Sequence, residues 1–313
     1  MSGAWKADTM PGPKTVISKR GLNMKEAIPS VENAKSGEWV DWNKECITVL
    51  DGVIYAHTED GFLRMDCLWD DTIDDRSRPA IIWIHGGGFI EPNATRKNRP
   101  EERFLTLLRK GYLIAAIDYR ISQVRPFPSQ IQDCKCAVRY LRANAKKLGI
   151  DPARIGVWGE SCGGQLAGLM SVKGGIEGFE DFGGYEGISS DISCAVSWYG
   201  ALDVMEFHRL RMAVDDLYPK QFEVMYGGNP YEMGEMLTKA SPLTYAEKPC
   251  APLLALCSDG DSRVSYTVNI EFCKRGTAAG NVAEFVLVPN QEHGYIQGGE
   301  YDQKVFDFFE KWL

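Results

Sequence analysis

Short, continuous runs of apolar residues alternate with amphipathic segments along most of this chain. The runs cover residues 80–84, 112–117, 155–158, 194–198, 252–257 and 283–288. Runs of this length are typical of parallel strands that are buried on both faces. Between several of them apolar residues recur every three or four positions, most clearly from Ile131 to Leu148, as they do on one face of a helix. The pattern predicts an α/β fold with a mostly parallel sheet covered by helices on both faces.

The two ends of the chain follow other patterns. Residues 1–42 are polar, contain three prolines and show no sustained period, which predicts an irregular arm. Residues 46–57 and 62–69 are β-rich and flank a turn-like sequence, so we expect an antiparallel hairpin at a sheet edge. An amphipathic helix is expected around Val305, Phe309 and Trp312. We therefore predict one catalytic domain over residues 43–313.

Two longer segments interrupt the alternation. Loops that follow strands in a parallel sheet share the ligand-binding edge. Residues 199–248 follow a strand, which predicts a small helical lid over that edge, inserted at about 200–248. The Gly-rich residues 173–190 follow a helix, so we expect them at the opposite edge, with a structural or interface role.

Composition restricts the partners and the compartment. The formal net charge of −8 disfavours binding to nucleic acid or to an anionic membrane surface. Nine cysteines without paired spacing are typical of reduced thiols. No stretch is apolar enough for a signal peptide or a membrane span, so we expect a soluble, cytoplasmic protein that acts on a small molecule. The sequence leaves open whether it forms a homo-oligomer.

The strongest chemical signal is Gly-Glu-Ser-Cys-Gly-Gly at residues 159–164. It lies directly between an apolar run and a helix-compatible stretch. A serine on such a sharp strand-to-helix turn is projected outward as a nucleophile, and the flanking glycines leave it room. The alternative is a Gly-rich turn that closes an ordinary strand–helix junction. We interpret Ser161 as the nucleophile.

A second signal follows the first apolar run, at His-Gly-Gly-Gly-Phe in residues 85–89. Three glycines allow backbone N–H groups to approach a ligand closely. We predict an oxyanion hole made by the amides of Gly87, Gly88 and Cys162. His85 is interpreted as a residue that fixes the loop, and a plain flexible loop is the alternative for the glycines.

These motifs carry a family resemblance, together with the sequences Phe-Pro-Ser-Gln-Ile-Gln-Asp at 127–133 and Gly-Ile-Asp-Pro-Ala-Arg-Ile at 149–155. The chain resembles the HGGG-bearing esterases, which include hormone-sensitive-lipase-like carboxylesterases, and more narrowly the BD-FAE (bifunctional feruloyl and acetyl-xylan esterase-like) branch. The resemblance covers roughly residues 45–313. It implies an α/β-hydrolase fold and the order serine, acid, histidine along the chain.

Few residues compete for the other two catalytic roles. Of four histidines, His293 lies past the last strand and before the terminal helix, where a loop can reach the serine. Two carboxylates, Asp259 and Asp261, follow the strand before it. In the related esterases an apolar residue stands three positions after the acid, as Val264 does after Asp261. We therefore prefer Asp261, and Asp259 before a glycine is interpreted as a turn residue.

Other residues suggest substrate contacts or plain packing. Aromatic residues that follow strands predict walls that limit the acyl length, with buried packing as the alternative. These are Phe89, Tyr119, Phe127 and Tyr199. His208, within the lid, is either a substrate contact or a surface residue. No metal-binding or nucleotide-binding motif occurs, so we expect no metal and no cofactor.

Together these features predict a serine carboxylesterase for short-acyl esters of sugar or aryl alcohols. A hydrolase of small amides, formamides or short peptides would use the same three residues. A non-catalytic ligand-binding homologue would keep the pocket without turnover.

Overall fold

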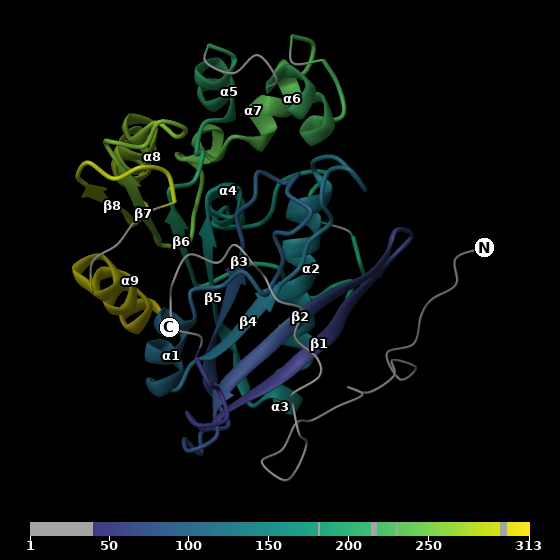
Figure 1. Cartoon of the computed structure of the whole chain (residues 1–313), viewed down its shortest axis with the longest axis vertical. Helices are drawn as coiled ribbons and strands as arrows, with labels where there is room; N and C mark the ends of the chain where they lie inside the picture. The colour runs from purple at the N-terminus through teal and green to yellow at the C-terminus, as the bar shows by residue number, and fades with distance from the viewer. Residues whose placement is uncertain (1–39, 181, 214–217, 230, 295–298) are drawn as a thin grey trace.

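An eight-stranded mixed sheet forms the centre of the computed structural model, which describes residues 40–180, 182–213, 218–229, 231–294 and 299–313 (Figure 1). The strand order is β1-β2-β4-β3-β5-β6-β7-β8. The strands are β1 (Ile47–Thr58), β2 (Gly61–Asp70), β3 (Arg78–Ile84), β4 (Leu113–Ile117), β5 (Ile150–Glu160), β6 (Cys194–Trp198), β7 (Leu253–Ser258) and β8 (Ala283–Val288). The predicted arm, residues 1–42, lies almost entirely outside the described residues.

Strand directions divide the sheet into two parts. β1 and β2 form the predicted antiparallel hairpin, and β2 also pairs antiparallel with β4. From β4 to β8 every pairing is parallel. The carboxyl ends of these parallel strands therefore lie along one edge, where α/β sheets place their ligands.

Helices cover both faces of the sheet. They are α1 (Glu101–Arg109), α2 (Ser129–Ala143), α3 (Ala145–Leu148), α4 (Cys162–Met170), α5 (Val204–Met212), α6 (Tyr218–Tyr226), α7 (Gly234–Ala240), the 3₁₀ helix η2 (Pro242–Tyr245), α8 (Tyr266–Ala278) and α9 (Gly299–Trp312). Apolar side chains of α2 and α4 pack in one buried cluster, and those of α1 and α9 pack in a second cluster. The fold is the α/β architecture that the apolar pattern predicts.

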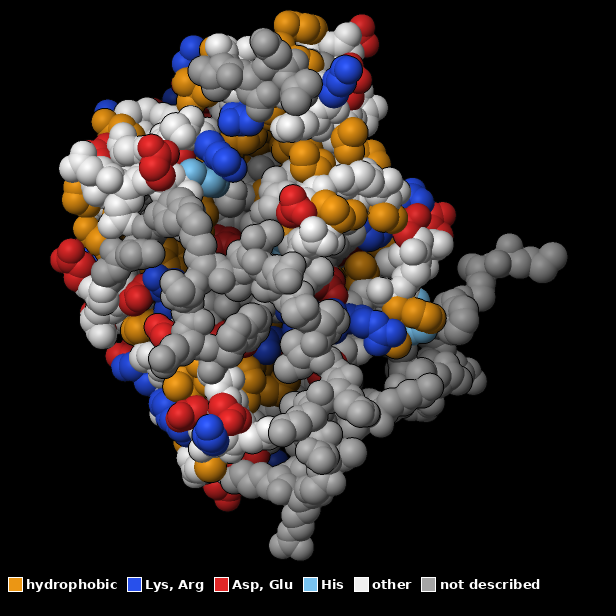
Figure 2. All heavy atoms as spheres, in the orientation of Figure 1, with side chains coloured by type: hydrophobic (Ala, Val, Ile, Leu, Met, Phe, Trp, Pro, Cys, Tyr) orange, Lys and Arg blue, Asp and Glu red, His pale blue; other side chains and the backbone are white. Residues whose placement is uncertain are grey.

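The helices α5, α6 and α7 lie between β6 and β7 in sequence and sit beyond the carboxyl edge of the sheet, above α4 in Figure 1. We call residues 199–248 the lid segment. Apolar side chains are visible on its outer surface in the space-filling view (Figure 2), and the exposed large hydrophobic residues there include Met205, Val224 and Tyr231. Asp203 begins α5 as an N-cap, since its side chain accepts hydrogen bonds from the amides of Met205 and Glu206.

Two sequence predictions about regular elements were wrong in part. β8 is not buried on both faces: it is one of the two edge strands, and only Val288 in it is fully buried. The helical pattern from Ile131 to Leu148 is not one helix, because it is divided into α2 and α3 at Asn144. In both cases the apolar pattern predicted the right type of element. It does not show whether a strand lies at a sheet edge or where a helix is interrupted.

The predicted position of residues 173–190 was also wrong in part. The segment does not stay at the far edge, because Phe179 packs against Phe127 with ring centroids 5.5 Å apart. The guanidinium carbon of Arg120 lies over the ring of Phe182, 4.0 Å from the centroid of that ring. Both partners follow β4, at the carboxyl edge. The segment therefore runs along α2 and supports the loops of that edge from outside.

Candidate active site

Ser161 lies on a strained turn between β5 and α4. Its backbone φ is 52° and its ψ is −118°, a conformation that non-glycine residues rarely adopt. The turn is tight: a Cβ on Gly159 would lie 2.0 Å from the carbonyl oxygen of Gly163, and one on Gly163 would lie 2.2 Å from that of Ile84. Glycine is required at both positions, which gives the predicted glycines a steric reason.

A chain of hydrogen bonds links Ser161 to a histidine and a carboxylate. The Oγ of Ser161 lies 2.9 Å from Nε2 of His293, and Nδ1 of His293 lies 2.7 Å from Oδ2 of Asp261. The carboxylate fixes the tautomer, because Nδ1 must carry the proton to donate to it, which leaves Nε2 free to accept from the serine. The structure therefore brings together the three residues that the sequence predicts for catalysis.

The two candidate carboxylates have different partners. Oδ1 of Asp261 accepts hydrogen bonds from the amides of Arg263 and Val264 at 2.8 and 2.9 Å, so its other oxygen is held toward His293. Asp259 turns away and accepts from the amide of Asn290 at 2.6 Å. Asp259 thus fixes the loop that carries the histidine, whereas Asp261 contacts the histidine itself.

Ser258 joins these two loops and was not singled out by the sequence analysis. Its Oγ accepts hydrogen bonds from the amides of Gly260 and Gln291 at 3.1 and 2.8 Å. The side chain is buried at the end of β7. A small hydroxyl residue directly after a buried strand is too common a pattern to reveal this role from sequence.

Residues 85–89, which we call the oxyanion loop, follow β3 next to the serine turn. Gly87 and Gly88 have φ values of 108° and 60°. A Cβ on Gly87 would lie 2.6 Å from the Cβ of Ala94, whereas one on Gly88 would have no neighbour closer than 4.0 Å. In the described part of the chain, no backbone acceptor is recorded for either amide. Neither amide is thus committed to a backbone carbonyl, although that of Gly88 lies near the sulfur of Cys162.

The buried rings of Tyr119 and His85 hold this loop in place. The hydroxyl of Tyr119 donates to the carbonyl oxygens of His85 and Gly86, at 3.0 and 3.2 Å. The ring of Tyr119 stacks on that of His85 with centroids 4.3 Å apart. Nδ1 of His85 hydrogen-bonds to the carbonyl oxygen of Gly86, and burial lowers the pKa of His85, so the ring stays neutral. Tyr119 and His85 thus hold the loop in place.

Cys162, the residue after the nucleophile, contributes its amide at the first position of α4. The amides of Phe89 and Gly88 lie close enough to its sulfur to lower the pKa of the thiol, but burial has the larger effect and raises this pKa to about 11. At neutral pH the thiol is protonated and therefore a poor nucleophile. Of the two side chains on the turn, the hydroxyl of Ser161 is the one hydrogen-bonded to an imidazole.

Glu160, the residue before the nucleophile, connects the oxyanion loop with the histidine. Its Oε1 accepts from the amide of Gly86 at 3.3 Å, and its Oε2 accepts from the hydroxyl of Tyr199 at 2.7 Å. The ring of Tyr199 packs edge-on against that of His293, with centroids 5.0 Å apart. Burial raises the pKa of Glu160, although these hydrogen bonds oppose the shift. Glu160 was not predicted to be a site residue, although its position directly before Ser161 in the serine motif could have indicated it.

An aromatic wall extends from the oxyanion loop to the lid. Phe89 packs near Phe127, which contacts Tyr226, and Tyr226 contacts Phe222, with centroid separations of 6.5, 5.7 and 4.8 Å. His208 lies against Phe222 at 4.5 Å and is buried, not a surface residue. We use the name aromatic wall for Phe89, Phe127, Phe222 and Tyr226. The four-residue spacing of Phe222 and Tyr226 on α6 was a signal for a helix face that the sequence analysis did not use.

No group of three or more histidine, cysteine, aspartate or glutamate side chains is arranged to hold a metal ion in the described ranges. Among the described residues, no helix is both long and apolar enough to cross a membrane.

The chain is similar in sequence to a probable ester hydrolase. The chain is 29% identical over 187 residues to the probable carboxylic ester hydrolase LipM of Mycobacterium tuberculosis, which covers 59% of this chain and 42% of that protein. This chain thus spans less than half of the length of that relative.

Two solved structures have the same fold. One is a bifunctional GH43-CE protein of Bacteroides eggerthii, with a TM-score of 0.74, 26% identity and coverage of 85% of this chain and 35% of that one. The other is a truncated carbohydrate esterase from gut microbiota, with a TM-score of 0.71, 25% identity and coverage of 85% and 96%. The BD-FAE family model matches residues 65–275, which is more than half of the chain. On its sequence and on the α/β-hydrolase fold that it shares with these esterases, the chain belongs to the BD-FAE family.

Proposed function

We propose that this protein is a serine carboxylesterase that hydrolyses short-acyl esters of sugar or aryl alcohols through an acyl-enzyme on Ser161. The observation that carries the proposal is the hydrogen-bonded chain from Ser161 through His293 to Asp261, next to two amides of the oxyanion loop that lack backbone acceptors. The relative named as a probable carboxylic ester hydrolase supports the reaction class, and the similar carbohydrate esterase from gut microbiota supports a sugar as the alcohol.

In the first half of the reaction, His293 acts as a general base. Its Nε2 takes the proton of the Ser161 hydroxyl as Oγ bonds to the carbonyl carbon of the ester. Asp261 stabilises the imidazolium ion that forms. The amides of Gly87, Gly88 and Cys162 stabilise the negative charge on the carbonyl oxygen. The tetrahedral intermediate then expels the alcohol oxygen, which receives the proton from Nε2, and an acyl-enzyme remains.

In the second half, water takes the place of the alcohol. His293 removes a proton from the water as its oxygen bonds to the acyl carbon. The intermediate expels Oγ of Ser161, which recovers its proton from His293, and the carboxylic acid leaves. Each residue is regenerated, so the cycle needs no cofactor.

The aromatic wall supports the preference for short acyl groups. Each of its four side chains exposes 3% of its surface or less, so the rings already fill their side of the site. Close-packed interiors do not admit extra methylene groups without strain. We therefore expect acetyl to butyryl esters to be preferred over long-chain esters.

Two measurements test the proposal. A fluorophosphonate probe should label the wild-type protein, and Ser161→Ala should abolish labelling. The specificity constant kcat/KM for p-nitrophenyl esters from acetate to palmitate should have its maximum at short chains, and a maximum at eight carbons or beyond contradicts the short-acyl preference. Matched amide substrates should be hydrolysed far more slowly than esters, and the reverse order favours an amidase.

A further inference from the structure

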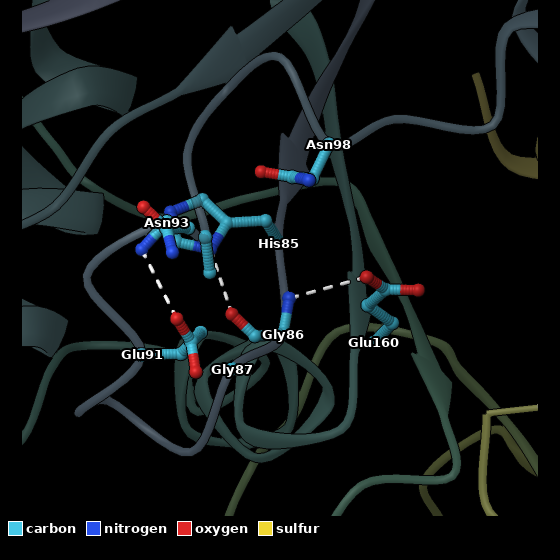
Figure 3. Close-up of a pocket in the computed structure, with 8 residues that line it drawn as sticks. His85, Gly86, Gly87, Glu91, Asn93, Asn98 and Glu160 are labelled. Carbon is cyan, nitrogen blue, oxygen red and sulfur yellow. Dashed lines mark hydrogen bonds between the residues drawn. The ribbon is translucent and has the colours of Figure 1, made fainter. Parts of the chain in front are cut away.

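A cavity lined mainly by polar residues adjoins the oxyanion loop. The proposed mechanism does not use it. It is a cavity of about 270 Å³. Figure 3 shows Glu91 and Asn93 on one side of it and Glu160 on the other. We call it the polar cavity; its lining residues are His85, Gly86, Gly87, Glu91, Asn93, Ala94, Asn98 and Glu160.

The polar cavity is close to the reacting atoms. A Cβ on Gly86 would lie 3.3 Å from the Cβ of Ser161, and Gly87 supplies one of the assigned oxyanion amides. Glu160 reaches His293 through the hydroxyl and ring of Tyr199. Neither Ser161 nor His293 lines the cavity, but a ligand there would lie against Gly86, which adjoins the serine, and Glu160, which is linked to the histidine through Tyr199.

The titratable side chains that line the cavity are mainly acidic. Two carboxylates and no lysine or arginine line it, although Arg103 lies near enough to Glu160 to oppose the rise in its pKa. The cations of the following loop are directed elsewhere, because Arg96 and Arg99 pair with the buried carboxylate of Asp66 at 2.7 and 2.9 Å. Glu91 is exposed, and it has no ion-pair partner among the side chains that the structure describes. Its carboxylate accepts a hydrogen bond from the amide of Asn93, at 3.2 Å.

The mechanism decides which part of the substrate lies here. The leaving alcohol oxygen must approach Nε2 of His293 to receive its proton, so the alcohol portion extends toward the histidine side. Resting on the esterase function proposed above, we propose that the polar cavity binds the alcohol portion of the ester, and that Glu91 makes it favour positively charged alcohols over negatively charged ones. Glu91 is thus a specificity-determining residue of the site.

Two acetate esters of matched shape test this. Their alcohols are 4-(trimethylammonio)phenol, a cation, and 4-hydroxybenzenesulfonate, an anion. The quantity to compare is the ratio of kcat/KM for the cationic ester to that for the anionic ester, in the wild type and in Glu91→Gln. Because both proteins meet the same two esters, differences in intrinsic reactivity cancel between them. Loss of one exposed charge should lower the ratio about 3- to 5-fold.

Three controls make the result specific. Glu186→Gln removes an equal charge beside Tyr185, whose ring packs on Tyr140 in the second half of α2, and it should leave the ratio unchanged. Added salt should lower the wild-type ratio and have less effect on that of Glu91→Gln, since exposed charges are screened. Competitive inhibition by phenyltrimethylammonium should weaken in Glu91→Gln, whereas the preference between acetyl and butyryl esters of one alcohol should stay the same.

The outcomes separate the two proposals. Equal ratios in the wild type and in Glu91→Gln, or an equal decrease in Glu186→Gln, would overturn the assignment of Glu91. A wild-type protein that does not hydrolyse neutral p-nitrophenyl acetate would overturn the esterase function itself, and the inference with it.

Discussion

The two sides of the oxyanion loop contain different kinds of side chain. On one side the rings of the aromatic wall are buried, with Phe222 fully inaccessible to solvent. On the other side Glu91, Asn93 and Asn98 are exposed around an open polar cavity. Packed apolar surfaces discriminate by size, at about 1–3 kcal/mol per methylene group, whereas fixed charges discriminate by sign. Under the two proposals made above, the acyl group would be selected by its length and the alcohol by its charge.

The largest effect on turnover should come from replacing Ser161, the proposed nucleophile for both parts of the substrate. Ser161→Ala should lower turnover by about 10⁴-fold or more on every ester, because the acyl-enzyme cannot form, and it should leave the fold intact. Initial rates and circular dichroism spectra measure the two effects. If Ser161→Ala kept turnover close to that of the wild type on any ester, Ser161 would not be the nucleophile for that ester.

The next prediction concerns the acid. Asp261→Asn should lower kcat by about 10⁴-fold, since an amide can hold His293 in the wrong tautomer. Asp259→Asn is the matched control, and it should lower kcat by less than about 10-fold because its partner is the amide of Asn290. Steady-state kinetics of the two variants decide the assignment, and the reverse ranking would move the catalytic role to Asp259.

At Gly87, between the two sides, adding a single methyl group should affect kcat. Gly87→Ala should lower kcat about 10²- to 10³-fold, because the new Cβ meets Ala94 at 2.6 Å in a backbone conformation with φ of 108° and displaces an oxyanion donor. Gly88→Ala meets no neighbour within contact distance, so its loss should be smaller. Equal losses in the two variants would indicate backbone strain in general and not a displaced donor.

A smaller effect is expected on the aromatic wall. Phe127→Leu should raise the hexanoyl-to-acetyl ratio of kcat/KM by about 3- to 10-fold, since it removes ring volume from a closed surface. It should also destabilise the fold by about 1–3 kcal/mol, which thermal or urea unfolding measures. The ratio of cationic to anionic alcohols should not change. A variant that altered alcohol selectivity and not acyl selectivity would contradict the division between the two sides.

The smallest expected effect concerns the thiol beside the nucleophile. Iodoacetamide at neutral pH should leave activity unchanged, because the pKa of Cys162 is raised to about 11 and the reactive thiolate is scarce. Mass spectrometry of the treated protein measures labelling at this residue. Rapid inactivation with modification of Cys162 would show that the thiol is ionised in the active protein.

Local sequence determined much of this molecule. Steric limits on a tight turn require glycines around Ser161, and continuous apolar runs specify buried strands, so both could be predicted without coordinates. Among the four histidines, the sequence favoured His293 because it lies between the last predicted strand and the terminal helix. The resemblance to known esterases supplied the order of the three residues and the preference for Asp261.

Tertiary structure decided what depends on contacts between distant segments. The choice between Asp259 and Asp261 depends on which carboxylate turns toward a loop about 30 residues away. Tyr119 and Tyr199 are alike in sequence, as aromatic residues after strands, yet one supports the oxyanion loop and the other packs on His293. The polar cavity exists because the loop after β3 folds back over the residue before the serine. A sequence pattern reports which residues are buried, but the partner of each side chain is set by how the strands and loops come together in space.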